Sequence, residues 1–182
     1  MRFERWVGGL LICVGLNACT LERTVLRDSA SSTYWRAADE LDFWDDLALR
    51  PVTTNSDALH GLLGLAGEEA STEAYDLRLA AARERGWIST DDELLRNESA
   101  TVGMIAVAVC DILGVQGGLS MRVLGPSPRY CTKELVFREL IPPRTENQSL
   151  SGLEFIDLVS RMEDELRRQS AGAAEPREET ES

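Results

Sequence analysis

The sequence predicts an all-α protein, and three observations support this. Apolar side chains recur every three to four residues through most of the chain, which is the period of an amphipathic helix. Serine or threonine precedes several of these segments and glycine follows them, as at helix caps. Capped segments begin at Thr54, Thr101 and Ser151, at nearly equal intervals of about 50 residues, which indicates a repeated helical unit.

The composition fits one modest globular domain and argues against some partners. The chain has 182 residues, 43% of them hydrophobic, and a formal net charge of −12. Because nucleic acids and anionic lipids attract basic surfaces, this charge argues against nucleic-acid binding and a polybasic lipid patch. The single histidine, His60, and the lack of a recognisable catalytic motif lead us to expect no enzyme, cofactor or metal site.

Residues 1–18 have the organisation of a secretory signal peptide. Two arginines precede an apolar stretch at 6–16, which is shorter than the ~20 residues of a membrane-spanning helix. The stretch runs into Leu-Asn-Ala-Cys at 16–19, which resembles the lipobox of bacterial lipoproteins. The alternative is an ordinary signal peptide in which Cys19 is there by chance.

The lipobox resemblance implies cleavage before Cys19, diacylglycerol on its thiol and a third acyl chain on its amine. Several acyl chains, at ~0.8 kcal/mol per buried methylene, would give a stable membrane anchor. Residue 20 is Thr and not the Asp that often retains such proteins at the inner membrane, which favours the outer membrane, facing the periplasm. Residues 19–32 become Ser-rich and are predicted to be a lipidated tether.

The first predicted unit covers about residues 33–68 of a helical domain. Its first helix begins near the start of this range, with Leu41 and Trp44 on the inner face. Its second helix covers 54–67, where Asp57 stands three residues after the threonine cap. Glycines within this second helix weaken it, so packing against neighbours must hold it.

The second predicted unit covers about residues 69–118. Its first helix ends at Gly86, after which Trp87 returns to the core. Its second helix starts after Thr101 and is free of charge almost to its end, which predicts that it is covered on most sides.

The third predicted unit covers about residues 126–168. Its first helix follows a serine cap with Pro128 at the first helical position. In its second helix, Ser151 and Glu154 have the spacing of a capping box. The domain is predicted to end at residue 170, and the acidic segment 171–182 is predicted to be a disordered tail.

These units resemble S-layer homology repeats. The residues that carry the resemblance are Gly86, Trp87, Ile88, Asn97, Thr101, Asn147, Ser151 and Glu154. In that family three repeats form a pseudo-threefold helical bundle whose grooves bind cell-wall polysaccharide, so the resemblance implies this arrangement for 33–170. The arginine of the family motif is replaced by Asn55, Val102 and Gly152.

Several side chains are candidate ligand contacts. Asp57, Ser151 and Glu154 occupy motif positions, although the carboxylates have an alternative role as capping partners. Trp35 is a candidate platform for a sugar ring. Arg122 and Arg129 lie in the predicted loop 117–129 and are candidates for a partner contact, the alternative being that this loop is a plain connector between units.

Two cysteines remain in the predicted domain, Cys110 and Cys131. In an oxidising periplasm such a pair can form a disulfide. The alternative is a pair of buried free thiols, which are common in protein cores.

The sequence therefore favours a lipid-anchored envelope protein that acts as a non-catalytic binding or scaffolding module. Its partner would be wall glycan or another envelope protein, in addition to the membrane. Two alternatives remain: a small envelope hydrolase that uses Asp57 or Glu154 with His60, and a purely structural subunit of an envelope assembly. The hydrolase requires these side chains to meet in one cleft.

Overall fold

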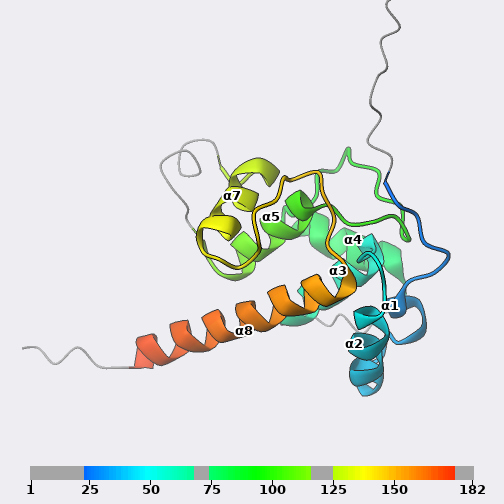
Figure 1. Ribbon diagram of the computed structural model, residues 1–182, viewed down its shortest axis with the longest axis horizontal. Coiled ribbons are helices and arrows are strands. Elements are labelled where there is room, and N and C mark those ends of the chain that lie inside the picture. The colour runs from blue at the N-terminus through cyan, green and yellow to red at the C-terminus, as the bar shows by residue number, and fades with distance from the viewer. Residues whose placement is uncertain (1–22, 68–73, 116–124, 175–182) are drawn as a thin grey trace, which may run out of the picture.

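The computed structural model describes residues 23–67, 74–115 and 125–174, and within them the protein is all-α (Figure 1). Strand-like pairing in these ranges is limited to isolated bridges, Val25 with Glu98 and Thr54 with Ser99. The helical elements are α1 Ala30–Thr33, η1 Ala37–Asp39, α2 Glu40–Ala48, α3 Asn55–Leu65, α4 Tyr75–Glu84, α5 Val102–Ile112, α7 Pro128–Phe137 and α8 Gly152–Ala174. None of these helices is both long enough and apolar enough to cross a membrane.

Four of the predicted helix starts are confirmed. The side chains of Thr54, Thr101 and Ser127 each accept a hydrogen bond from the backbone N–H three residues later, at 3.2, 3.2 and 3.4 Å. Ser151 and Glu154 form the capping box: the Ser151 N–H donates to Glu154 Oε2 at 2.8 Å. The Glu154 N–H donates back to Ser151 Oγ at 3.3 Å. Each cap satisfies backbone donors that the first helical turn leaves free.

The predicted glycine ends are also confirmed for three helices. Gly67, Gly86 and Gly114 follow α3, α4 and α5 with φ of 75°, 74° and 61°. In this left-handed region glycine has no steric penalty, so the chain can leave each helix through a tight turn.

Backbone hydrogen bonds join the starts of α3, α5 and α8. The first N–H group of each helix donates to a carbonyl in the segment that precedes another of these three helices. The first backbone N–H groups donate in cyclic order: Asn55 to the Glu98 carbonyl at 2.8 Å, Val102 to Gln148 at 2.7 Å, and Gly152 to Arg50 at 3.1 Å. The first two bonds link residues just under 50 positions apart, and the third links the last helix start back to the segment before the first, as a closed array of three repeats of that period would. Whether the three whole units superpose stays a prediction.

Helix α5 is deeply buried, to the same extent as α3. All residues from Val102 to Cys110 are buried, as the uncharged sequence predicted. The core around it draws on every long helix, with Phe43 and Phe155 among its largest fully buried side chains. Helices α3 and α7 pack directly against α5, so α5 links two sides of the domain.

The described part of the predicted tether is packed into the domain instead. Ser29, Ala30 and Ser31 are fully buried, and residues 30–33 form α1. The Ser31 N–H donates to Asp57 Oδ1 at 2.8 Å, and its hydroxyl lies 2.9 Å from the Ser56 hydroxyl. Ser-rich composition predicted a solvated linker, but these hydroxyl and amide groups find partners inside the protein.

The inner face predicted for the first helix is wrong at Leu41 and right at Leu47. The chain forms η1 and then α2, which begins only at Glu40. Phe43 and Leu47, one turn apart, are fully buried, whereas Leu41 is 81% exposed. Phe43 therefore takes the core position that was predicted for Leu41, on the helix that packs on α1 and α8.

Candidate binding groove

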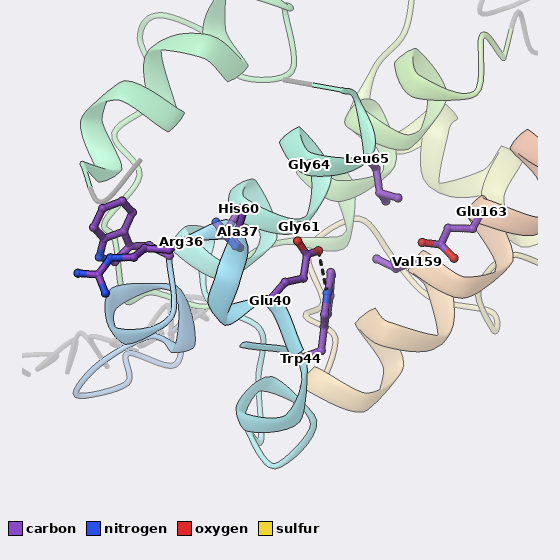
Figure 2. Close-up of a pocket in the computed structure, with 11 residues that line it drawn as sticks. Arg36, Ala37, Glu40, Trp44, His60, Gly61, Gly64, Leu65, Val159 and Glu163 are labelled. Carbon is purple, nitrogen blue, oxygen red and sulfur yellow. Dashed lines mark hydrogen bonds between the residues drawn. The ribbon is translucent and has the colours of Figure 1, made fainter. Parts of the chain in front are cut away.

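A groove of about 350 Å³ lies where η1, α2, α3 and α8 meet (Figure 2). Its lining residues are Trp35, Arg36, Ala37, Glu40, Trp44, His60, Gly61, Gly64, Leu65, Val159 and Glu163. Figure 2 shows Arg36 and Glu163 toward opposite ends, with the α3 residues between them. The groove thus combines indole rings, both signs of charge and a floor made largely by one helix.

Two glycines give α3 the shape that this floor requires. A Cβ at Gly61 would lie 2.9 Å from Trp44 Cη2 and 3.1 Å from Phe155 Cε1, so these rings lie directly against the helix backbone. A Cβ at Gly64 would have no atom within 4 Å. Gly61 therefore allows close packing, while Gly64 leaves open space in the groove.

The aromatic walls of the groove carry polar groups beside them. Trp44 is half-buried, stacks on Phe155 at a centroid distance of 6.5 Å, and donates its indole N–H to Glu40 Oε1 at 3.1 Å. Trp35 is also half-buried, and the Arg36 guanidinium lies 5.0 Å from the centre of its ring. Such amphipathic aromatic surfaces are typical of binding sites in which a ligand has both apolar and polar faces.

His60 lies at the base of the groove, 8% exposed, with a fixed orientation. Its Nδ1 is 3.1 Å from Arg78 Nη1, and its ring makes an edge contact with Phe43 at 4.5 Å. A guanidinium can only donate, so Nδ1 accepts and the neutral ring carries its proton on Nε2.

Beneath His60, a buried polar network connects α1, α3 and α4. Arg78 is 1% exposed, and its Nη2 donates to the Ser56 hydroxyl at 2.9 Å. Burial lowers the pKa of Arg78 to about 10, while the negative charge of Asp57 acts in the opposite direction. Asp57 is itself fully buried and accepts hydrogen bonds from the Thr54 hydroxyl at 2.7 Å and the Ser31 N–H. The network holds elements together and has no solvent-exposed carboxylate to offer a ligand.

The structure does not bring the three proposed hydrolase residues together. Neither Asp57 nor Glu154 is among the described residues that line the groove with His60. Glu154 caps α8 through Ser151 and forms an ion pair with Arg144. Partial burial raises its pKa, but hydrogen bonds from Ser151 and the charge of Arg144 outweigh that effect and leave the pKa below its ordinary value. Both carboxylates therefore have the capping role that the sequence offered as the alternative.

Of the other predicted contacts, only Trp35 lies at the groove. Arg129 is exposed near the start of α7, away from it, and Arg122 and Cys19 lie outside the described residues. Sequence reasoning missed the groove residues Arg36, Glu40 and Glu163, which come from separate elements. Besides Trp35, the signal that pointed here was the pair of glycines in a helix that otherwise buries its side chains.

Cys110 and Cys131 are buried free thiols that lie side by side. The Cys110 S–H donates a hydrogen bond to the Cys131 sulfur, which raises the pKa of Cys110, together with burial, and lowers that of Cys131. The disulfide between them stays a prediction. In the described ranges, no three His, Cys, Asp or Glu side chains gather in a way that could hold a metal ion.

The groove can therefore pack an apolar ring face on indole while acidic and basic groups bind polar substituents at its edges. Nothing in its geometry places a nucleophile next to a base within the described residues. No protein-family model, curated protein or solved structure matches this chain.

Proposed function

We propose that this protein is a lipid-anchored module of the cell envelope that binds wall glycan in the groove between α2, α3 and α8. The observation that carries this proposal is the lining of the groove, where Trp35 and Trp44 lie near Arg36, Glu40 and Glu163. The volume of about 350 Å³ is in the range of small-ligand sites.

Sugars suit such a groove because each ring has an apolar C–H face and a polar edge. An indole provides a wide, rigid surface for the C–H face at low cost in side-chain entropy. Exposed carboxylates accept hydrogen bonds from hydroxyl and amide groups, and a guanidinium donates to ring and carbonyl oxygens. Arg36 and Glu163 provide these two kinds of group toward the two ends of the groove.

The lipobox at 16–19 supports attachment to a membrane through Cys19, and Thr20 favours the outer membrane. The cyclic hydrogen bonds among the starts of α3, α5 and α8 support the pseudo-threefold arrangement that the S-layer homology resemblance implies. The groove lies on α3 and α8, the second helices of the first and third predicted units. In this proposal the lipid fixes the protein to the membrane and the domain reaches the wall.

The proposal is one of binding without catalysis. Asp57 and Glu154, the carboxylates that a hydrolase would have used with His60, take part in helix caps. The groove carboxylates Glu40 and Glu163 are exposed to solvent, so neither lies in the buried, water-excluded surroundings that are typical of a catalytic acid.

Co-sedimentation with insoluble peptidoglycan tests this function, using the detergent-extracted protein. Gly64→Leu places a side chain in the open space of the groove, and Gly172→Leu makes the same change on an exposed part of α8 with no atom nearby. The unchanged protein and Gly172→Leu should sediment with peptidoglycan, and Gly64→Leu should stay in solution. Retention on outer-membrane proteins but not on peptidoglycan would instead assign the groove to a protein partner, and retention on neither would overturn the binding module.

A further inference from the structure

The amino-terminal segment is fastened to the domain from Thr24 onward. The Ser99 N–H donates to the Thr24 carbonyl at 2.7 Å, and the Leu26 N–H donates to the Asn97 carbonyl at 2.9 Å. Between them, Val25 forms an antiparallel bridge with Glu98. Thr24 is therefore the first residue held by the backbone of the domain in the described chain.

Side chains secure the same segment further along. The Asn97 amide donates to the Arg27 carbonyl at 3.0 Å, and Arg50 Nη1 donates to both the carbonyl and a carboxylate oxygen of Asp28, at 2.8 and 2.9 Å. The segment then enters the core at Ser29 and Ala30. Releasing it to lengthen the connection to the membrane would break these bonds and expose buried groups.

The remaining connection to a lipid on Cys19 is short. A fully extended chain spans at most about 3.6 Å per residue, so Cys19 and Thr24 lie no more than about 18 Å apart. From this reach we infer that the surface around Thr24 and Ser99 faces the lipid headgroups and rests on them. The inference depends on the proposed lipid anchor, and it adds to that proposal which face of the domain meets the membrane.

The charge of this surface suits that orientation. A shallow hollow of about 610 Å³ is lined there by Arg23, Thr24, Ser99, Pro143, Arg144, Asn147, Gln148 and Ser149. These described lining residues include two arginines and no carboxylate, although the whole chain has a net charge of −12. Each arginine also pairs with a glutamate outside the hollow, Glu98 or Glu154, so its attraction to lipid phosphate is modest.

In this orientation the parts of the domain that lie away from Thr24 face the wall. Figure 1 shows α8 extending away from the blue amino-terminal segment. On its exposed face Asp157, Glu163 and Asp164 each pair with an arginine, Arg161 or Arg167, so this face offers no net positive charge to attract anionic lipid. The binding groove shares no described lining residue with the surface around Thr24, so membrane contact leaves the groove open.

Thiol accessibility on vesicles tests this orientation. The lipid-bearing protein is reconstituted in phosphatidylethanolamine–phosphatidylglycerol vesicles as two variants, Asn147→Cys on the proposed contact surface and Ser160→Cys on α8. Both native residues are exposed, whereas Cys110 and Cys131 are buried, and the unchanged protein gives the background rate. A bulky polyethylene glycol maleimide should label position 147 several-fold more slowly than position 160.

The matched control lengthens the connection. Twenty Gly/Ser residues inserted between Glu22 and Arg23 add a root-mean-square span of about 25 Å, which should bring the labelling rate at position 147 up to that at position 160. Equal rates without the insertion, or protection that persists with it, would overturn the inference while leaving the lipid anchor intact. Absence of acyl chains on Cys19 by mass spectrometry would overturn the anchor itself, and this inference with it.

Discussion

Polar residues have opposite roles in the two regions where α3 and α8 come together. At the helix starts, Asp57 and Glu154 bond to caps and to backbone N–H groups of neighbouring segments. In the groove, less than two turns further along α3, Glu40 and Glu163 are exposed beside indole rings and the open space at Gly64. The first region holds the fold together, and the second is free to meet a ligand.

The comparison shows that the type of a residue alone does not decide whether it stabilises the fold or is available to a ligand. Each region contains carboxylates, an arginine and a small residue, and the two regions differ in how deeply these residues are buried. Asp57 and Arg78 are almost inaccessible, so their charges can only serve each other and the groups around them. Changes in the first region should therefore alter stability, and changes in the second should alter binding.

The largest effect should come from Arg78→Met. Removing the guanidinium takes away a positive charge that interacts with the buried Asp57 and breaks the bonds to His60 and Ser56, which should cost about 3–5 kcal/mol of unfolding free energy. Urea unfolding followed by circular dichroism measures this loss. Arg167→Met on exposed α8 is the control and should change stability by less than about 0.5 kcal/mol. Equal effects of the two changes would remove the distinction between buried and exposed charge.

The next largest effect should come from Gly152→Ala at the start of α8. A Cβ there would lie 1.7 Å from the Leu47 carbonyl oxygen, so backbone would have to move. We expect a loss of about 3 kcal/mol, at the upper end of overpacking effects. Gly172→Ala, in the same helix with no atom within 4 Å, is the control and should not destabilise. A thermal unfolding scan that finds Gly152→Ala as stable as the unchanged protein would contradict the close approach.

A smaller effect of opposite sign is expected for Gly64→Ala in the groove. The helical φ is compatible with alanine and nothing lies within 4 Å, so the protein should gain about 0.5–1 kcal/mol of stability. Gly61→Ala, in the same helix, meets Trp44 and should lose stability instead. Urea midpoints that shift in the same direction for both would show that the groove floor is not shaped as described.

The smallest effect is a pH dependence at Glu154. Because its folded pKa lies below the unfolded value, it stabilises the fold at pH above the unfolded pKa, and this stabilisation is lost as pH falls through the folded pKa. Glu154→Gln should therefore be less stable at neutral pH, by less than about 1 kcal/mol since the side chain is partly screened by solvent. The difference in unfolding free energy should vanish in acid, and a constant difference across that range would contradict the assignment.

Much of the fold could be predicted from sequence because its signals are local. Thr54 and Ser151 identify helix starts through side chains that bond within one turn, and Gly86 and Gly114 identify ends through backbone conformation. The choice of Leu41 over Phe43 as a core residue failed because it depends on where α2 begins and on what packs against it.

The groove was largely beyond sequence reasoning. Its charged residues Arg36, Glu40 and Glu163 are separated along the chain, and only tertiary packing brings them together. Trp35 was found because, unlike Trp44 and Trp87, it does not fall on a predicted inner face. The prediction of a tether at 19–32 was wrong for the serines of α1. Their composition favours a solvated linker, whereas their burial depends on hydrogen-bond partners in α3.

The dissociation constant for solubilised peptidoglycan fragments, measured for the unchanged protein and for Trp35→Ala, tests the central claim most directly. Trp35 supplies a half-buried ring at the groove and takes no part in the fully buried core. We predict that Trp35→Ala weakens binding at least tenfold, the ~1.4 kcal/mol expected from losing an aromatic contact, while the urea midpoint stays nearly unchanged. Equal dissociation constants for the two proteins would contradict the assignment of this groove to glycan binding.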